Sequence, residues 1–386
     1  MSYSFDKLPI HDLLVPVVSA SAALARLDER LHSSPVRTGW IERTHFLDAA
    51  AALWLEGELV QMEDLVLHDE RMDVRAPTHE LTRAHAVLRA RRRIHAAKPD
   101  WALSRAGLRE LAGLSAPQEE GPADQSRDHA SVPGVGHQDD ELVVGATGDK
   151  ADPLAAHFAA LDAVLERANL LLDGKRVERR PDSVEETAQP VPLRVRSELV
   201  YDLEWDESAR MAEWTAVLER TEGLPAMLRA VVLLDAWEQI NVLQHGGWLG
   251  GLLVASLLRR EGLTLHHLPC LHLGSRAIAR ERRRSPDQTR RLLAFLSSIE
   301  AAVELGIKEH DKLMLAKAQM ERRLAKRRSN SRLPELIELV LARPMVSTTM
   351  IQKALKVTQQ GAINLVEELA LREMTGRKRF RAWGVL

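Results

Sequence analysis

The sequence predicts a mainly α-helical protein that ends in a small winged helix-turn-helix domain. Two observations predict this fold class. Apolar residues recur at helical spacing along most of the chain, whereas the alternating Val, Ile, Thr and Tyr runs typical of strands are nearly absent before the C-terminus. The C-terminal segment instead combines three short apolar stripes with a glycine-centred basic stretch, a pattern typical of three helices followed by a β-hairpin.

The composition predicts a folded protein with more than one domain. Its 386 residues suffice for two or three domains, and 45% apolar with 28% charged residues is ordinary for a globular chain. The net charge of -2 excludes a uniformly basic nucleic-acid coat, so any attraction to phosphate must come from local patches. The single cysteine, Cys270, excludes an intrachain disulfide and favours a reducing compartment.

We expect neither a signal peptide nor a membrane helix. The first residues, MSYSFDKLPIHDLLVP, contain acidic side chains and no sustained apolar run. No stretch of the chain reaches the roughly 20 apolar residues that a membrane helix needs. The sequence therefore predicts a cytoplasmic localisation and no membrane partner.

Helical and polar segments alternate along the chain. The polar ones are rich in Pro, Gly, Asp and Gln and predict linkers. The predicted segments are an N-terminal helical domain (1–114), a flexible linker (115–152), a short helix plus a second linker (153–197), a helical core (198–328) and a winged helix-turn-helix (331–386). Within the third segment the helix is expected over 153–172. Within the two helical segments we expect helices over 19–32, 41–54 and 81–97, a central buried helix over 249–258, and one or two long amphipathic helices over 288–328.

The C-terminal segment carries the signals of three consecutive helices. Pro344 stops the first helix, Ser347 or Thr348 caps the second, and Thr358 caps the third. The residues expected to face inward are Leu333, Leu336, Ile337, Val340 and Leu341 in the first helix, Ile351, Ala354 and Leu355 in the second, and Ile363, Val366, Leu369 and Ala370 in the third.

This assignment leaves a polar outer face on the third helix. Gln359, Gln360, Ala362 and Asn364 lie on it, and Lys356 precedes it. In a helix-turn-helix this face presents groups to base edges, and Gln and Asn side chains suit adenine. We therefore predict that double-stranded DNA is the partner of this surface.

A basic hairpin follows the third helix. Gly376 is the expected turn, and Arg377, Lys378, Arg379 and Arg381 would lie on a wing beside the phosphates. Residues 331–386 hold nine basic and five acidic side chains, a net charge of +4 on an otherwise slightly acidic chain. The alternative interpretation is a winged helix used only for packing or dimerisation.

A second candidate site is the glycine-rich turn within WEQINVLQHGGWLGGLL (237–253). It joins a helix end to the start of an apolar helix, where free backbone N–H groups and the helix dipole attract anions. Gly246 and Gly247 leave the backbone accessible, and His245 could bind a phosphate. The alternative is that these glycines only permit close helix packing.

The order of these residues resembles the core of the Fic-type nucleotidyl-transferases. Their motif joins a helix end, FExIHPF, to an anion-holding turn, xDGNGR, and an apolar helix that closes in EGL. The stretch LWLEGELVQMEDL (53–65) is similar to the region of that family that carries a self-inhibitory glutamate, which falls on Glu56, while Ala52 replaces the usual Ser or Thr. The resemblance covers most of the chain outside the linkers and is strongest to a bacterial subfamily with a C-terminal helix-turn-helix.

The departures from that motif imply a catalytically degenerate body. The resemblance implies a general-base His, a metal-holding Asp and phosphate-binding Arg residues, because nucleotide transfer to a hydroxyl needs all three functions. At the matching positions this sequence has other residues: Asn241 or Ile240 for the base, His245 or Gln244 for the metal ligand, Trp248 or Leu249 for the first arginine, and Gly251 for the second. We therefore assign no catalytic residue and no cofactor.

The segment HHLPCLH (266–272) raises the question of a metal. Zinc needs about four ligands, and the chain holds no second cysteine. We expect these histidines to be structural or exposed and predict no metal site.

Three hypotheses follow. The first is a DNA-binding transcriptional regulator, a homodimer with a degenerate Fic-like body that could sense a small-molecule or nucleotide ligand. The second is a protein-nucleotidylating enzyme that works through a displaced residue such as His245. The third is a partner-binding scaffold.

Overall fold

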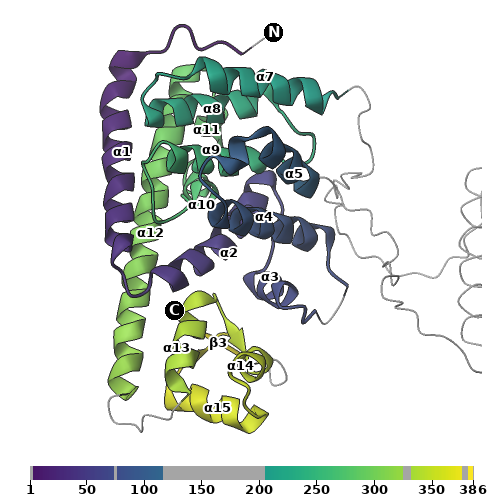
Figure 1. Ribbon diagram of the computed structural model, residues 1–386, viewed down its shortest axis with the longest axis vertical. Helices are drawn as coiled ribbons and strands as arrows, with labels where there is room; N and C mark the ends of the chain where they lie inside the picture. The colour runs from purple at the N-terminus through teal and green to yellow at the C-terminus, as the bar shows by residue number, and fades with distance from the viewer. Residues whose placement is uncertain (1–2, 74–75, 116–204, 325–331, 376–380, 386) are drawn as a thin grey trace, which may run out of the picture. The chain divides into compact units, whose positions relative to one another are not determined.

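The computed structural model describes residues 3–73, 76–115, 205–324, 332–375 and 381–385, and these are mainly helical (Figure 1). The prediction of a mainly α fold with a C-terminal winged helix is confirmed. The N-terminal helices are α1 (Ile10–His32), α2 (Arg37–Glu56), α3 (Met62–Asp69), α4 (His79–Ala96), the 3-10 turn η1 (Trp101–Leu103) and α5 (Arg105–Ser115). After residue 204 come α7 (Glu207–Arg220), α8 (Ala226–Ile240), α9 (Leu249–Arg260), α10 (Leu271–Arg276), α11 (Arg280–Arg283) and α12 (Gln288–Leu324).

The helices before residue 115 and those after residue 205 form one compact unit. Both groups of helices belong to the unit that spans Met1–Glu119 and Val200–Leu386. The predicted linkers, 115–152 and the second one within 153–197, and the predicted helix over 153–172 lie outside the described residues, apart from Ser115 at the end of α5.

Helix α9 is the centre of the body. Every residue from Leu249 to Leu258 is buried, which confirms the predicted central helix. A helix that is apolar on all sides is stable only in a core, because any exposed side would place apolar surface in water. Helices α8, α4 and α5 pack against it.

The long C-terminal helix α12 is a single element of 37 residues as far as Leu324. It packs against α1 and α10 along the body and also contacts the winged helix. Residues 325–328, the end of the predicted amphipathic stretch, lie outside the described residues.

Local signals account for where several helices begin and end. Thr78 caps α4 and Asp206 caps α7, each accepting a hydrogen bond from a backbone N–H three residues on. Gly57 ends α2 with a left-handed φ of 92°. The predicted helices over 19–32, 41–54 and 81–97 correspond to α1, α2 and α4, although α1 begins nine residues earlier, at Ile10.

Buried ion pairs connect helices that are distant in sequence. Asp48 of α2 is fully buried and accepts hydrogen bonds from Arg91 of α4 and His272 of α10, at 2.5 and 2.8 Å. Burial alone would raise the pKa of Asp48, but the charge of Arg91 and its other partners hold it below the usual value. Because an unpaired buried charge is costly, this network strongly specifies how α2, α4 and α10 meet.

Among the described helices, α1 is long and apolar enough, by length and composition alone, to cross a membrane. A buried helix of a soluble protein passes the same test. Within the unit, α1 packs along α12.

Candidate nucleic-acid interface

The C-terminal domain has the element order of a winged helix. It comprises α13 (Leu333–Ala342), β1 (Val346–Ser347), α14 (Thr348–Leu355), α15 (Gln359–Glu368), β2 (Arg372–Glu373) and β3 (Ala382–Gly384). The three strands form an antiparallel sheet in the order β1-β3-β2. The predicted inner stripe of α13 is confirmed, since its five members are all buried.

The caps of α14 and α15 fix the turn between them. Ser347 caps α14 by accepting from the N–H of Met350, which resolves the choice between Ser347 and Thr348. Thr358 caps α15 by accepting from the N–H of Gly361, as predicted. Between them Lys356 adopts a left-handed φ of 54°, which reverses the chain direction. The turn therefore depends on one strained residue and two hydroxyl caps.

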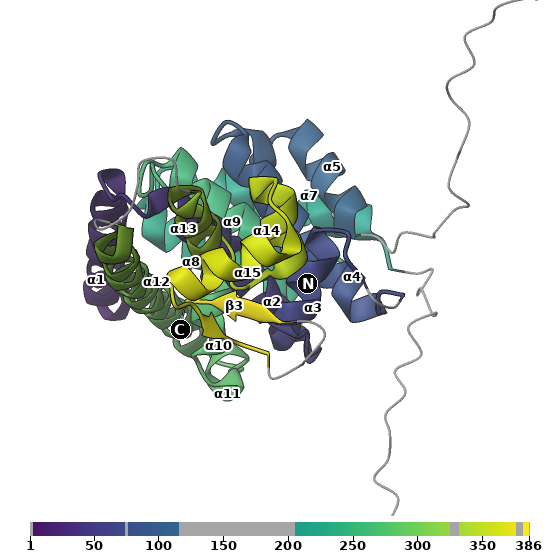
Figure 2. The same ribbon diagram turned by 90° about the horizontal axis from the view of Figure 1, so that it is seen from below.

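The outer face of α15 carries the predicted amides. Gln359, Gln360 and Asn364 are exposed, and Gln360 donates a hydrogen bond of 2.9 Å to Asn364. This pair holds the two amides side by side on the helix. Figure 2 shows α15 in front of the body helices. The exposure of the three side chains shows that no other described residue covers this face.

For three alanines the prediction of which side faces the core is wrong. Ala362, predicted on the outer face, is fully buried, whereas Ala354 and Ala370, predicted to face inward, are exposed. Ala370 falls after the end of α15 with a left-handed φ of 44°, which turns its methyl group out of the helical stripe. Ala354 is not needed for the helix contact because Ile351 and Leu355 fill it.

The hairpin from β2 to β3 is present as predicted, but its tip is not described. Arg377, Lys378 and Arg379 lie outside the described residues. Arg381 is exposed at the start of β3, where it pairs with Glu373 of β2 at 2.9 Å and lies over the ring of Trp383. An acidic side chain thus accompanies one of the predicted wing cations.

Buried and half-buried arginines attach the winged helix to the body. Arg43 of α2 donates to the backbone oxygens of Arg343 and Val385 at 2.7 and 3.0 Å. Arg343 in turn pairs with Glu70 at 2.9 Å and lies near Glu42. Gly39 of α2 permits the close approach, because a Cβ there would lie 3.1 Å from the backbone of Leu341. These contacts could not be predicted from the sequence, since nothing in the local pattern marks an arginine that binds 300 residues away.

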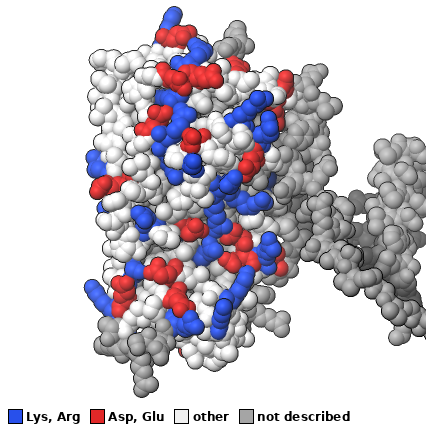
Figure 3. All heavy atoms as spheres, viewed as in Figure 1, with Lys and Arg blue, Asp and Glu red and all other residues white. Residues whose placement is uncertain are grey.

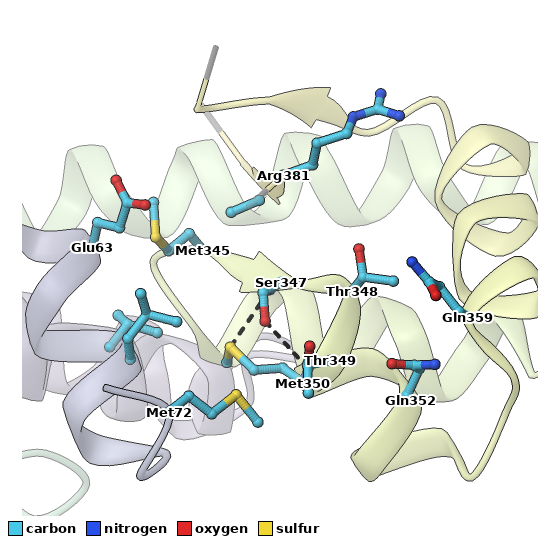
Figure 4. A pocket seen from close by; sticks show the side chains of 13 residues that line it. Glu63, Met72, Met345, Ser347, Thr348, Thr349, Met350, Gln352, Gln359 and Arg381 are labelled. Carbon is cyan, nitrogen blue, oxygen red and sulfur yellow. Dashed lines mark hydrogen bonds between the residues drawn. The ribbon is translucent and has the colours of Figure 1, made fainter. Parts of the chain in front are cut away.

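A cavity of about 250 Å³ lies between α3 and the winged helix (Figure 4). The thioethers of Met72, Met345 and Met350 form part of its lining. Gln359 and Arg381, two of the predicted DNA contacts, also line it. The cavity therefore connects the body to side chains of the candidate interface.

The glycine-rich turn before α9 is occupied by a carboxylate of the same chain. Glu56, at the end of α2, accepts a hydrogen bond of 3.0 Å from the backbone N–H of Trp248. A Cβ on Gly247 would lie 3.4 Å from the same carboxylate. A negative charge is thus seated at the N-terminal end of α9, where the helix dipole favours one. His245 and Gly246 are adjacent in the turn, half-buried and buried respectively.

Two other glycines of this region serve packing. A Cβ on Gly250 would lie 2.3 Å from the ring of Trp237, and one on Gly251 would lie 2.6 Å from His272. Both side chains are buried and hydrogen-bonded to backbone oxygens of the turn, Trp237 to Gly247 and His272 to Trp248. Close packing therefore explains Gly250 and Gly251, whereas Gly247 is exposed.

Glu56 has an arginine partner from a different helix. Arg83 of α4 binds both Glu56 and Glu58, and all three side chains are about one-fifth exposed. The glycine-rich stretch 237–253 contains no arginine, and the structure supplies one to Glu56 from α4. In the sequence Arg83 is one of several arginines of the basic segment 81–97, and nothing distinguishes it from the others.

The histidines of 266–272 are bound to carboxylates or to each other. His267 is 2.7 Å from Asp28, His272 is 2.8 Å from Asp48, and His266 is 2.8 Å from His32. Burial raises the pKa of the Cys270 thiol to about 12. Within the described ranges no group of three or more His, Cys, Asp or Glu side chains could hold a metal ion.

Charge is mixed on the face shown in Figure 3, where Lys and Arg side chains alternate with Asp and Glu. A mixed surface screens itself at short range and gives no broad field. Attraction to a polyanion must therefore act locally, as the net charge of the sequence predicts.

Two family models match separate parts of the chain, and one known protein is similar to it over its full length. Residues 199–325 match the family described as protein of unknown function (DUF1612). Residues 333–386 match the family described as HTH DNA binding domain. Over its full length the chain is similar to the uncharacterized protein y4cF of Sinorhizobium fredii, with 48% identity over 392 residues and complete coverage of both chains.

Proposed function

The chain belongs to the same protein family as y4cF, and on that premise we propose that it is a transcriptional regulator that binds double-stranded DNA. The observation that carries the proposal is the open face of α15. Its two amides, Gln360 and Asn364, are exposed and held side by side, while the opposite side of the helix is in the core. An amide pair on an otherwise uncovered recognition helix is suited to base edges in the major groove.

Cations on either side of α15 would bind the DNA backbone. Lys356 is exposed in the turn before the helix, and Arg381 is exposed on the strand that returns from the wing. Arg377, Lys378 and Arg379 complete the proposed phosphate contacts, and Gln359 adds a polar group at the start of α15. Phosphate contacts set the position on the duplex, and the amides set the sequence preference.

The regulator is proposed to act as a cytoplasmic homodimer. Winged helices commonly dock in pairs on palindromic sites, so that the two-fold axis of the protein matches that of the operator. A small-molecule or nucleotide ligand also stays a prediction. The cavity beside Gln359 and Arg381 is where a bound molecule could alter the DNA contacts.

For the body we propose a catalytically degenerate Fic-like domain. The contact between Glu56 and the N–H of Trp248 supports this, because the resemblance predicts a glutamate from the N-terminal region beside the anion-holding turn. The two residues are 192 positions apart in the sequence, so tertiary packing brings them together. Without the base, the metal carboxylate and the phosphate arginines, the domain would contribute shape and binding rather than group transfer.

The test of DNA binding starts with selection of genomic fragments by the purified chain. Binding to a selected fragment should weaken steeply as salt rises, since counterions are released from DNA. Replacing Arg377, Lys378 and Arg379 together with Ala should lower the slope of log affinity against log salt by roughly 3 and abolish retention. A matched triple, Lys98, Arg105 and Arg109 to Ala, removes the same charge from exposed positions on and before α5 and should change neither.

Two outcomes would overturn the proposal. Salt-independent or absent binding of the wild-type chain would favour the partner-binding scaffold. Equal loss in both triple variants would show that only overall charge matters and would reject the wing.

The enzyme hypothesis has its own experiment. Wild type and His245→Ala are incubated with labelled ATP and candidate protein acceptors, and covalent transfer of label is measured. The degenerate body predicts no transfer by either protein. Transfer by wild type that His245→Ala loses would establish the enzyme instead.

A further inference from the structure

Helix α1 carries an apolar stripe on its solvent side. Ile10, Leu14, Val15 and Val18 are between 50 and 75% exposed, and Ala22 and Ala25 are exposed as well. The opposite side of α1, with Leu13, Val17, Leu24 and Leu27 among its members, is buried. The helix is therefore apolar on two sides, and the unit covers one of them.

The exposed stripe has the spacing of a coiled-coil seam. Its central positions are separated by alternating steps of four and three residues: His11, Val15, Val18, Ala22, Ala25 and Glu29, all of them exposed. Steps of this kind keep side chains along one line that a second helix can follow. The seam extends over about 27 Å at 1.5 Å per residue.

Size complementarity favours an antiparallel partner with the same sequence. When two copies of α1 are placed antiparallel about a two-fold axis near residue 20, Val18 faces Ala22 of the second copy. Val15 likewise faces Ala25 of the second copy. Each branched side chain then lies opposite a methyl group, so the helices can approach to the shorter end of the usual 8–10 Å separation.

Charge complementarity favours the same register. In it His11 faces Glu29 of the second copy, and the flanking residues Asp12 and Arg26 lie opposite each other. All four side chains are exposed and available for these contacts. A parallel pair would instead place Glu29 against Glu29, which is repulsive.

We infer that the solvent face of α1 is the interface with a second copy of this chain, formed as an antiparallel helix pair. This inference rests on the proposed function only in that it assigns a surface to the homodimer proposed there. Helix α12 runs parallel to α1, since Ser19 bonds Glu300 and Arg30 bonds His310. The two long helices of each copy would then form a four-helix layer across the two-fold axis.

Sedimentation velocity of the full chain tests this interface. Wild type should sediment with twice the mass of one chain, and Val18→Glu should shift it to the mass of one chain. Leu265→Glu is the matched control, because Leu265 is 68% exposed and lies outside α1. It should leave the dimer intact, and circular dichroism should show the same helix content in all three proteins.

A mixing experiment tests the register. Ala22→Arg should also be monomeric by itself. Mixed with Val18→Glu, it should restore dimers that contain one copy of each variant, because the introduced arginine and glutamate then face each other while the second contact stays native. Absence of heterodimers would reject the antiparallel register.

Other results would overturn the inference as a whole. A monomeric wild type, or a Val18→Glu variant that remains dimeric, would reject α1 as the interface. A monomeric wild type that sediments with phosphatidylcholine and phosphatidylglycerol vesicles would assign the stripe to a lipid surface instead.

DNA retention measured on the same samples separates the two proposals. Val18→Glu should bind DNA more weakly through a single winged helix and keep its salt dependence. A dimer that never binds DNA would refute the proposed function alone.

Discussion

The buried guanidinium of Arg43 donates a hydrogen bond of 3.0 Å to the backbone oxygen of Val385, at the end of the winged helix. The same side chain binds the oxygen of Arg343 and forms an ion pair with Glu309 of α12. One residue of α2 therefore connects the long helix to two separate segments of the winged helix. The position of the candidate interface depends on a contact that spans almost the whole sequence.

Arg43→Ala should destabilise the protein by about 3 kcal/mol, because it removes the arginine partner of the half-buried Glu309 and the donor to two backbone oxygens. Urea unfolding measures the loss, and hydrogen exchange should rise first at β3 and the loop after α13. Arg93→Ala is the control, since Arg93 forms an exposed ion pair with Glu110 and its loss should change stability far less than the loss of Arg43. Equal effects of the two variants would show that Arg43 does not hold the winged helix.

Gly250→Ala should destabilise the core by about 1–3 kcal/mol, since the new methyl group would collide with the ring of Trp237. Thermal unfolding and the change in tryptophan fluorescence between wild type and variant report the displacement. Gly113→Ala should change stability in the opposite direction, because Gly113 lies in α5 and no atom lies within 4 Å of the position of the added Cβ. That change should stabilise α5 by about 0.5–1 kcal/mol. A neutral Gly250→Ala would mean that the turn is looser than the structure shows.

Lys356→Gly should separate stability from DNA binding. Glycine relieves the left-handed strain at φ 54° and should stabilise the winged helix by about 1 kcal/mol. The same change removes a proposed phosphate contact and should lower the salt slope of DNA binding by about 0.9. Thermal unfolding and a salt titration measure the two effects, and Lys356→Asn, which tolerates the turn, should weaken binding similarly. Undiminished affinity in both variants would remove Lys356 from the interface.

Stability should fall as the pH is lowered from about 6.5 to 4. Burial, reinforced by neighbouring cations, holds the pKa of His45 well below its usual value and lowers that of His95 to about 4. The unfolded chain therefore binds protons in this window while the folded chain does not, so the folded state loses stability. Burial would raise the pKa of Asp69, but hydrogen bonds from His85 and Arg92 and the charge of Arg92 hold it below the usual range, so Asp69 contributes losses only at lower pH.

Urea unfolding at a series of pH values checks this window, with His95→Gln as the comparison. The variant should show a shallower fall between pH 6.5 and 4 than wild type. An unchanged slope would mean that His95 is solvated in the folded protein.

The candidate interface could be predicted largely from local signals. Ser347 and Thr358 cap their helices because a hydroxyl three residues before a free N–H is a local arrangement. The faces of the alanines could not be predicted in the same way. Ala354 and Ala362 are chemically identical, yet one is exposed and the other is buried. The methyl group of alanine is so small that its hydropathy does not predict whether the residue faces the core or the solvent.

The contacts that assemble the body were beyond local reasoning. Glu56 meets Arg83 of α4 and the N–H of Trp248, which are 27 and 192 residues away. No pattern within one helix indicates such partners, since they are chosen by the packing of several helices at once. The sequence motif placed Glu56 near the turn only through a resemblance, and the motif itself contains no arginine to pair with it.

By itself the sequence determined the helical class, the winged helix and the polar face of α15, because periodicity, caps and charge are properties of neighbouring residues. The sequence also contains both apolar stripes of α1, but because both are apolar, hydropathy does not indicate which of them is buried. Only the tertiary structure decided that Leu13 and Leu24 face the core while Val15 and Val18 face solvent. The physical reason is that burial is settled by which surfaces of distant segments fit together, and that fit exists only once the chain has folded.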